Sequence, residues 1–406
     1  PPVYKARMDD VVVGSSTKQG LLARARDLAG HWLLRDVLLP FALVRGALLW
    51  LVWWARQYAP SWTYADPVAA ARGWAYVPNL YLDVWGRYDT IWYLDVARNG
   101  YVVRGPLETV QSNVAFFPLY PLLVRALHEL VPPAWQGTAA LYLCALAISN
   151  AAAVVALGLL FVLVRDVWAD RELARKTVLY TLLFPSGFFL SCAYSESLFL
   201  LLSVGAFVAA HRGRWWWAGI CAALAAATRA TGIFLAPALA WTYLAQRGFS
   251  LRRVRADVAA LALPIVALAL HAANVARVSG DWLGMFHVQA AWHRHFAWPW
   301  RTLNVRGHRF MGQVDRFAMF GFIGLTTVLA ALRRVDWLLY AALSLGPILF
   351  SGVPMSAARL LVVVFPGFAA LAWLTRREGV HLATSLLLFG MQIAMFTSWA
   401  RFYWAG

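Results

Sequence analysis

The sequence predicts an all-α fold: a polytopic membrane helical bundle of about eleven transmembrane helices with two ordered extracytoplasmic loops. Hydrophobic residues make up 61% of the chain and charged residues only 14%, against roughly 45–50% apolar residues in soluble domains. Apolar runs of about the length that crosses a hydrocarbon core of roughly 30 Å recur along most of the chain. We expect helices because these runs lack the alternation of barrel strands, and because lipid cannot satisfy an open backbone.

The apolar runs alternate with two kinds of connector. The runs cover residues 38–55, 138–165, 177–193, 197–211, 215–229, 232–246, 256–277, 314–332, 337–351, 357–375 and 380–400. Arginine-rich connectors occupy every second junction, at residues 165–176, 212–214, 247–255, 333–334 and 376–377. The positive-inside rule places them, and an N-terminal arm of residues 1–36, in the cytoplasm. Residues 37–406 then form one membrane domain, and we expect no cleavable signal peptide because the arm lacks an apolar core.

Two of the outward junctions are long, residues 56–137 and 278–313. Both are rich in tryptophan, tyrosine, proline and arginine, so we expect ordered caps that lie against the membrane. Residues 113–130 in the first junction allow two interpretations. Either they form a span, which requires residues 138–165 to cross twice, or they form an interfacial helix.

The net charge of +17 does not indicate nucleic acid as a partner, because most basic residues lie in the connectors, where they set membrane orientation. Only three of the 36 basic residues are lysine, a bias typical of GC-rich genomes that favours a bacterial source. The cysteines lie inside apolar runs, where we expect them to act as small apolar residues: Cys144, Cys192 and Cys221.

Ionisable residues within or beside the apolar runs fall at the outward ends of their segments: Asp83, Arg87, Asp89, Glu196, Arg229 and Arg359. Such residues cost free energy in a membrane and usually face the protein interior or a water-filled cavity. Their common depth therefore predicts a shared site. The alternative is that the arginines only extend to the membrane interface.

The stretch YDTIWY, residues 88–93, carries the main catalytic candidate. On a helix, Asp89 shares a face with Trp92 and Tyr93. Aromatic rings pack against sugars, and apolar surroundings raise the pKa of a carboxyl group toward the range of a general base. An interfacial aromatic belt with Asp89 as a helix cap is the alternative. Asp95 lies far around such a helix, so the sequence does not imply a carboxylate pair.

Three other segments supply candidates. Glu196 lies at a short junction and either caps the next helix or contacts a hydroxylated ligand. Arg229 and Arg359 lie at outer helix ends, where two guanidinium groups together suit a phosphate.

The second long loop is rich in histidine and aromatic residues. The histidines, His287, His293 and His295, lack the cysteines or carboxylates that would support a metal site, and an interfacial helix with histidines facing water is favoured. A glycolipid groove could be lined by Trp282, Phe286, Gln289 and Trp292.

An ordered series of motifs over roughly residues 80–400 carries a resemblance: RYDTIWYLDVARNGY, NVAFFPLYPLLVR, FPSGFFLSCAYSESLFLLL, ATRATGIFLAP, GDWLGMFHVQAAW and ARLLVVVFP. With these the chain resembles the family of the second mannosyltransferase of glycosylphosphatidylinositol assembly and its bacterial relatives, in the GT-C class. The resemblance implies a membrane enzyme that moves mannose, with inversion, from polyprenyl phosphate mannose to an acceptor hydroxyl such as that of a glycolipid.

The family motifs fall on particular residues of this chain. A tryptophan–aspartate pair falls on Tyr88 and Asp89, so the aspartate is kept and the tryptophan is replaced. A tyrosine, serine and glutamate motif falls on residues 194–196, which favours ligand contact for Glu196. The family's third motif usually has proline where this chain has Ala230.

These residues predict one displacement at the extracytoplasmic membrane surface. Asp89 accepts the proton of the acceptor hydroxyl, while arginines stabilise the departing lipid phosphate. The expected substrate-binding residues are Arg87, Tyr88, Trp92, Tyr93, Tyr194, Glu196, Arg229, Gln289, Trp292 and Arg359. We expect no metal or other cofactor, because the leaving group is a lipid monophosphate. The alternative function is a multi-span transporter or lipid flippase, which Arg45 in the first span fits best.

Overall fold

The computed structural model describes residues 32–55, 74–305 and 310–403. Within these ranges all regular structure is helical, and none of the described residues forms a strand. The all-α class predicted from the sequence is therefore confirmed. Most of the arm predicted for residues 1–36 lies outside the described residues, as does part of the first long junction.

In the described part of the chain, five helices are long and apolar enough to cross a membrane: Leu34–Ala55 (η1 with α2, Leu39–Ala55), α7 (Thr138–Trp168), Ala256–Ser279 (η7, Ala256–Ala262, with α12, Leu263–Ser279), α15 (Phe310–Ala331) and α19 (Glu378–Ala400). Shorter helices occupy the remaining apolar runs: α8 (Arg171–Leu183), α9 (Glu196–His211), α10 (Trp215–Ala226), α11 (Leu235–Gln246), α16 (Val335–Leu349), α17 (Ala357–Leu361) and α18 (Phe365–Leu374). Each predicted apolar run thus contains a helix, although only five of the helices described here reach a spanning length.

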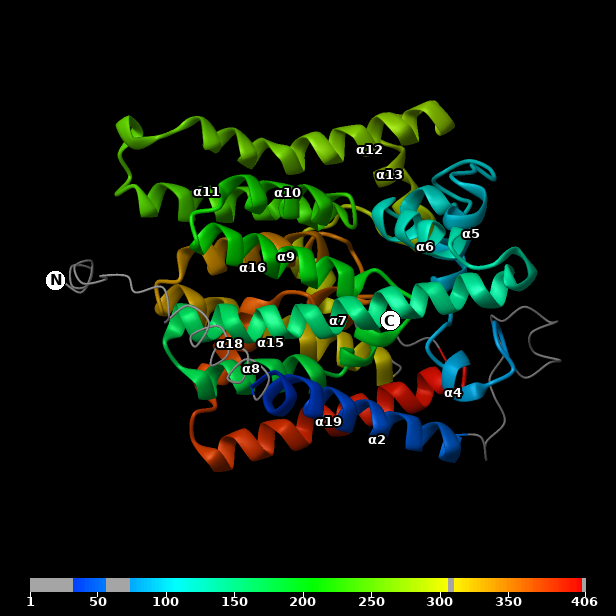
Figure 1. Cartoon of the computed structure of the whole chain (residues 1–406), viewed down its shortest axis with the longest axis horizontal. Helices are drawn as coiled ribbons and strands as arrows, with labels where there is room; N and C mark the ends of the chain where they lie inside the picture. Colours follow the sequence, from blue (N-terminus) through cyan, green and yellow to red (C-terminus); the bar gives the residue numbers. More distant parts are fainter. Residues whose placement is uncertain (1–31, 56–73, 306–309, 404–406) are drawn as a thin grey trace, which may run out of the picture.

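The long helices lie side by side along the longest axis of the molecule (Figure 1). In this view α12 forms one edge, α2 and α19 form the opposite edge, and α7 and α9 lie between them. The short helices α4 (Leu80–Asp83), α5 (Thr90–Asn99), α6 (Leu119–Glu129) and α13 (Gly284–His287) gather at one end. The two long junctions of the sequence therefore meet at the same end of the bundle.

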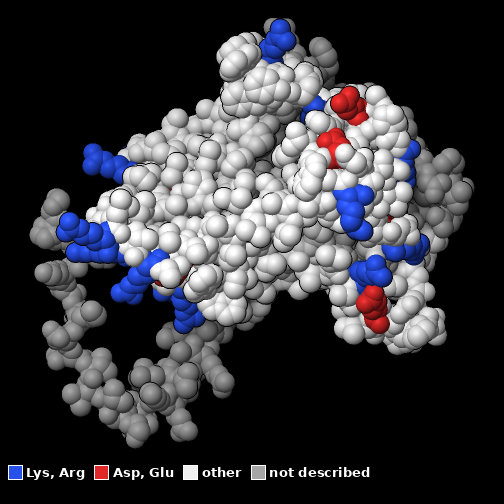
Figure 2. Space-filling model, turned by 90° about the horizontal axis from the view of Figure 1, so that it is seen from above, with Lys and Arg blue, Asp and Glu red and all other residues white. Residues whose placement is uncertain are grey.

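Charged side chains are sparse over the middle of the visible surface (Figure 2). Basic side chains gather at one end, and a mixture of basic and acidic side chains lies at the other. An uncharged zone between charged ends is the surface expected of a bundle that crosses a membrane.

The ambiguous segment 113–130 forms neither a span nor part of one. Its helix α6 has 11 residues, too few to cross a bilayer, whereas α7 is a single helix of 31 residues. At a rise of 1.5 Å per residue α7 is about 46 Å long, so it crosses once and extends beyond the hydrocarbon core. Of the two interpretations, the structure agrees with a short outer helix.

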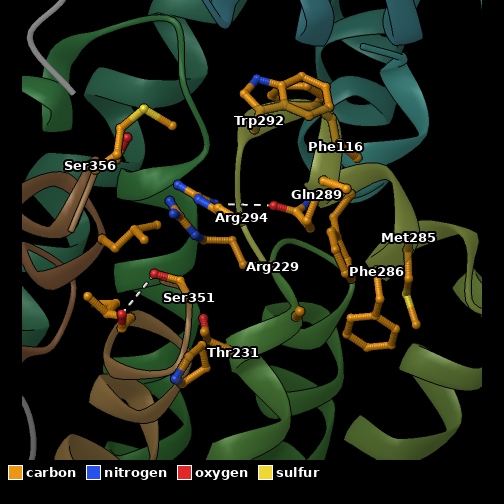
Figure 3. A pocket seen from close by; sticks show the side chains of 18 of the residues that line it. Phe116, Arg229, Thr231, Met285, Phe286, Gln289, Trp292, Arg294, Ser351 and Ser356 are labelled. Atoms are coloured by element: carbon orange, nitrogen blue, oxygen red, sulfur yellow. Dashed lines mark hydrogen bonds between the residues drawn. The ribbon is translucent and has the colours of Figure 1, made fainter. Parts of the chain in front are cut away.

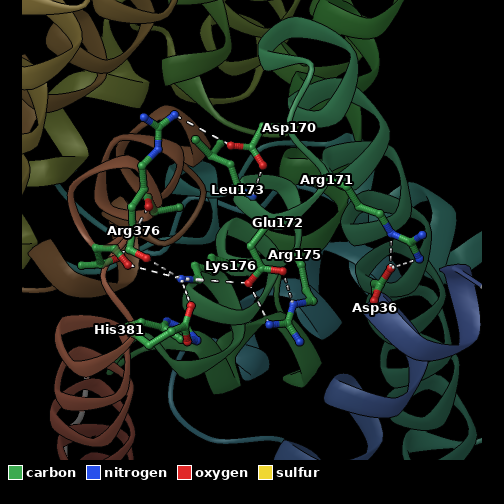
Figure 4. Close-up of polar contacts among 12 residues, drawn as sticks. Asp36, Asp170, Arg171, Glu172, Leu173, Arg175, Lys176, Arg376 and His381 are labelled. Carbon is green, nitrogen blue, oxygen red and sulfur yellow. Dashed lines mark hydrogen bonds and ion pairs between the residues drawn. The ribbon is translucent and has the colours of Figure 1, made fainter.

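Ion pairs join the helices at the end of the bundle away from α5 and α6. Lys176 of α8 is buried and donates to the carboxylate of Glu378 at 2.9 Å, at the start of α19. Asp36 accepts from Arg171 at 2.8 Å (Figure 4).

Arg45, within α2, donates to the hydroxyl of Ser191 at 2.6 Å and to the carbonyl of Gly187 at 2.9 Å. These contacts give Arg45 a structural role between α2 and η4 (Gly187–Ser191).

Candidate active site

The first outer segment is held by a buried ion pair. Asp83, at the end of α4, accepts hydrogen bonds from three backbone amides, including that of Tyr76 at 2.7 Å. Its carboxylate also lies 2.8 Å from Nη1 of Arg87, and the Arg87 guanidinium lies 3.9 Å from the centre of the Phe402 ring. Arg87 therefore joins the outer segment to the C-terminal segment. It does not line the cavity described below.

Asp89 lies immediately before α5 and is directed inward. The preceding Tyr88 has a φ of 45°, a left-handed turn that sets the direction of the chain into the helix. The side chain of Asp89 makes no capping hydrogen bond, so the helix-cap alternative is wrong. Instead Oδ2 accepts from Nη1 of Arg359 at 2.6 Å, and the residue is only 6% exposed.

Glu196 connects the two predicted arginines. Its Oε1 lies 2.7 Å from Nη1 of Arg229 and 3.5 Å from Nε of Arg359. Glu196 is 1% exposed, at the first position of α9. Because the side chain engages both guanidinium groups, it does more than favour the helix N-terminus. Four ionisable residues from four separate parts of the chain thus form one network: Asp89, Glu196, Arg229 and Arg359.

Local backbone features place the two arginines. Arg229 precedes η5 (Ala230–Phe234), and Gly232 of this turn packs so closely on α10 that a Cβ would lie 2.3 Å from the amide nitrogen of Ala226. Arg359 lies on α17, whose first amides are bound by the buried carboxylate of Asp315. Asp315 accepts from the amides of Ser356 at 3.0 Å and Ala358 at 2.8 Å.

Three members of the network, Asp89, Arg229 and Arg359, line a cavity of about 870 Å³. Polar lining residues include Asp89, Arg229, Gln289, Arg294, Ser351, Ser356 and Arg359. Apolar lining residues include Phe117, Ile233, Phe234, Leu268, Met285 and Phe286. Figure 3 shows Arg229 and Arg294 directed toward one region, while Met285 and Phe286 lie on another side. The cavity therefore has a charged part and an apolar part, as an amphiphilic ligand requires.

The predicted aromatic residues take different positions around this cavity. Tyr93 and Trp292 line it, whereas Trp92 lies behind and packs on Phe116 and on Trp292 with ring centres 6.1 and 6.0 Å away. Tyr93 forms a 2.8 Å hydrogen bond with the hydroxyl of Ser195, and burial raises the pKa of Tyr93 to about 12.

Tyr88 and Tyr194 support the site from outside the cavity. The hydroxyl of Tyr194 accepts from the amide of Asp89 at 3.0 Å and donates to the carbonyl of Arg87 at 2.9 Å. Tyr88 packs on Trp399 with ring centres 5.6 Å apart and donates to the carbonyl of Phe402. Both tyrosines therefore fix the turn that positions Asp89.

The second long junction contributes a cavity wall rather than one interfacial helix. It forms α13, η8 (Val288–Trp292) and α14 (Pro299–Asn304). Phe286, Gln289 and Trp292 line the cavity, but Trp282 is 65% exposed and lies outside the lining. His287 contacts the carboxylate of Asp281 at 2.6 Å. Among the described residues there is no group of three or more side chains suited to hold a metal.

Sequence reasoning missed Arg294, Ser351, Ser356 and Asp315. Arg294 stands in the stretch WHRHF, where the two flanking histidines are the more conspicuous candidates for a site. Asp315 lies near the start of an apolar run, where a polar residue is common at a helix end. Its role depends on backbone amides 41 and 43 residues later in the chain, which no local pattern indicates.

A family model described as "Mannosyltransferase (PIG-V)" matches residues 54–274, more than half of the chain. GPI alpha-1,6-mannosyltransferase 2 of Mus musculus is 34% identical over 157 residues, which cover 36% of this chain and 29% of that protein. GPI mannosyltransferase 2 of Chaetomium globosum is 32% identical over 131 residues, which cover 30% of this chain and 26% of that protein. The matches thus span less than a third of these relatives.

Among solved structures, the apo form of the Archaeoglobus fulgidus oligosaccharyltransferase has a TM-score of 0.47 and 13% identity, covering 90% of this chain and 56% of that chain. Its complex with Zn and sulfate has a TM-score of 0.42 and 14% identity, covering 80% and 49%. The family assignment rests on the match of the family model to residues 54–274, and the two mannosyltransferase relatives agree with it. This chain belongs to the mannosyltransferase (PIG-V) family.

Proposed function

We propose that the protein is a membrane mannosyltransferase that moves mannose from polyprenyl phosphate mannose to an acceptor hydroxyl, with inversion at the anomeric carbon. The single observation that carries the proposal is the buried carboxylate of Asp89, 2.6 Å from Arg359 and in the wall of a cavity that Arg229 also lines. A base and two phosphate-binding groups are the parts that this reaction needs.

The reaction is one displacement. The acceptor oxygen attacks the anomeric carbon, and the bond between that carbon and the phosphate oxygen breaks with its electron pair remaining on the phosphate. Asp89 takes the proton of the acceptor hydroxyl. A protonated Asp89 no longer holds Arg359 as an ion pair, so this guanidinium becomes available to the phosphate at the moment when the phosphate gains charge.

The shape of the cavity supports a lipid-linked substrate. Its volume of about 870 Å³ lies within the range of ligand pockets, roughly 300–1,000 Å³. The apolar side, with Leu268 of α12 and Phe234 of η5, suits the start of an isoprenoid chain. A glycolipid acceptor would enter from the membrane in the same way as the donor.

The active site belongs on the extracytoplasmic face in this proposal. The arginine-rich connectors, which the positive-inside rule assigns to the cytoplasm, lie at the opposite ends of the helices that carry Glu196, Arg229 and Arg359. The same rule puts the N-terminus in the cytoplasm, in a multi-pass protein of the cell membrane. Labelling of single introduced cysteines from outside intact cells tests this orientation.

No divalent metal takes part in the proposed reaction. A bridging metal serves best where a diphosphate must leave, and here arginines offset the charge of a single phosphate. Chelation is tested below.

Purified protein tests the proposed function directly. We expect protein in lipid nanodiscs, with no ion gradient, to transfer labelled mannose from polyprenyl phosphate mannose to a membrane glycolipid acceptor. NMR of the product should show an anomeric configuration opposite to that of the donor. A retained configuration excludes the single displacement, and gradient-dependent lipid movement without product supports the transporter or flippase instead.

A further inference from the structure

Arg294 lines the charged part of the cavity and has no carboxylate partner. Among the described residues no acidic group lies within 4.0 Å of its guanidinium, whereas Arg229 is paired with Glu196 and Arg359 with Asp89. Nη1 of Arg294 donates instead to the amide oxygen of Gln289 at 3.2 Å (Figure 3). The other acidic group in the lining is Glu108, which makes no ion pair with Arg294.

The backbone around Arg294 is fixed on both sides. The amide of Arg294 donates to the carbonyl of Gln289 at 3.1 Å, and His293 before it has a φ of 60° that reverses the chain. After it, the amides of His295 and Ala297 donate to the carbonyls of Ser351 at 3.2 Å and Phe350 at 3.0 Å. The segment is thus attached to the end of α16, and the guanidinium occupies a set position.

Its surroundings keep Arg294 short of counter-charge. Burial, together with the positive charges of Arg359 and Arg229, lowers the pKa of Arg294 to about 10. The group still carries its charge at neutral pH. A partly buried cation with an amide as its partner, beside two neutralised ion pairs, is a place where an anion would be stabilised.

We propose that Arg294 is the primary ligand of the donor phosphate. This inference rests on the proposed function and assigns a residue to it that neither the sequence pattern nor the family match identified. The charges of Arg229 and Arg359 are already balanced by Glu196 and Asp89. Arg294 is therefore the group whose positive charge attracts the monoanionic phosphodiester of the lipid-linked sugar.

The charges of the site support this assignment. Before transfer, the guanidinium groups of Arg229, Arg294 and Arg359 face the carboxylates of the ion-pair network, those of Asp89 and Glu196, and a phosphodiester with one negative charge. The charges of these groups balance. Transfer moves one proton to Asp89, which becomes neutral, and leaves a phosphomonoester that has gained one negative charge. The charges balance again, and Arg359 is released from Asp89 toward the phosphate. Without Arg294 the same states carry one uncompensated negative charge, which disfavours both donor binding and departure of the phosphate.

The test compares Arg294→Gln and Arg294→Met with Arg301→Gln. Arg301 is an exposed arginine of α14 on the same loop and does not line the cavity. Binding of polyprenyl phosphate and of uncharged polyprenol to purified protein would be measured by calorimetry, alongside steady-state mannose transfer. Thermal unfolding identifies the variants that are folded.

We expect both Arg294 variants to bind polyprenyl phosphate at least about tenfold more weakly than wild type, because a charge-assisted contact is lost. Polyprenol binding should be unchanged, donor KM should rise and kcat should fall. Arg294→Lys should recover part of the phosphate affinity, and Arg301→Gln should match wild type.

Either of two results overturns the inference while leaving the proposed function standing: folded Arg294 variants that bind polyprenyl phosphate like wild type, or an equal loss in Arg301→Gln. Wild-type protein that neither transfers mannose nor binds polyprenyl phosphate would reject both this inference and the proposed function.

Discussion

Replacing Glu196 by glutamine should lower the free energy of unfolding of the protein and at the same time raise its affinity for a lipid phosphate. Glu196 is 1% exposed, and its Oε1 lies 2.7 Å from Arg229 and 3.5 Å from Arg359. Glu196→Gln keeps the shape and one acceptor oxygen but removes the charge. Two adjacent guanidinium groups are then left with Asp89 as the remaining carboxylate of the network.

The cost to stability follows from removing one partner of a buried ion pair, which is about 3–5 kcal/mol. The glutamine oxygen still accepts from Arg229, whose side chain is 13% exposed next to the cavity, so the low end applies. A loss of about 3 kcal/mol corresponds to a rise of about 150-fold in the unfolding equilibrium constant.

The gain in phosphate binding has the opposite sign. For a separation of about 7 Å, one additional uncompensated positive charge contributes about 2 kcal/mol to phosphate binding at an effective dielectric constant of about 20. We therefore expect polyprenyl phosphate to bind at least about tenfold more tightly, and the lipid product to leave more slowly.

Thermal unfolding of purified protein, with and without polyprenyl phosphate, measures both effects. The variant should unfold at a lower temperature than wild type, and the ligand should raise that temperature by more in the variant. Glu172→Gln is the matched control, because Glu172 pairs with Arg175 in a half-exposed position at the other end of the molecule (Figure 4). Weaker phosphate binding in Glu196→Gln, or unfolding like wild type, would refute the reasoning.

Three other predictions follow from the site and its surroundings. Arg87→Gln should cost about 3–5 kcal/mol of stability, because it breaks the buried ion pair with Asp83. The donor KM of the folded fraction should stay unchanged, and a large rise in KM would show that Arg87 contacts the donor. Burial raises the pKa of Asp95, but hydrogen bonds from Arg104, Asn99 and Asn113 outweigh this effect and lower the pKa below its ordinary value. The resulting stabilisation of the fold is therefore fully present above the ordinary pKa of an aspartate, and it is lost as the pH falls through the lowered pKa of Asp95. Hydrogen exchange of residues 99–113 should therefore accelerate on acidification below about pH 4 in wild type but little in Asp95→Asn, and an equal response would contradict this. EDTA should leave mannose transfer within about twofold of the untreated rate, since arginines offset the phosphate charge, and a loss restored by Mg²⁺ or Mn²⁺ would show a metal requirement.

The sequence predicted the fold class and the central network for the same physical reason. Charged residues are costly beside apolar runs, so Asp89, Glu196, Arg229 and Arg359 were conspicuous, and the alternation of connectors put them at one depth. In the structure these four residues meet through contacts of 2.6, 2.7 and 3.5 Å. Their partners could not be assigned from the sequence, because the contacts join segments more than 30 residues apart.

The pairing of Arg87 has a local signal in the sequence. Asp83 and Arg87 are four residues apart, a spacing at which opposite charges often pair, and the structure places them 2.8 Å apart. Arg294, by contrast, was missed. In a polar, aromatic loop an arginine costs nothing, so only the attachment of residues 295–297 to Phe350 and Ser351 reveals that it is directed into the cavity.

The length of an apolar run does not indicate whether a single helix fills it, so the number of spanning helices does not follow from the runs alone. Several predicted runs are interrupted by turns, as between α8 and η4 or between α17 and α18, which divide one apolar run into two short helices. The carbonyl of Gly187, at the start of η4, accepts from Arg45, whereas Arg359 of α17 lines the cavity. The interruption after α17 thus lies beside a charged residue of the cavity.

Single-turnover mannose transfer by Asp89→Asn tests the central claim most directly. With donor at saturation, we predict a rate about 10²- to 10⁴-fold below wild type, the usual contribution of a general base. Donor binding should be retained or tightened, because Arg359 loses its carboxylate partner and can face the phosphate. A folded Asp89→Asn protein that transfers mannose at a rate comparable to wild type would contradict the assignment of Asp89 as the base.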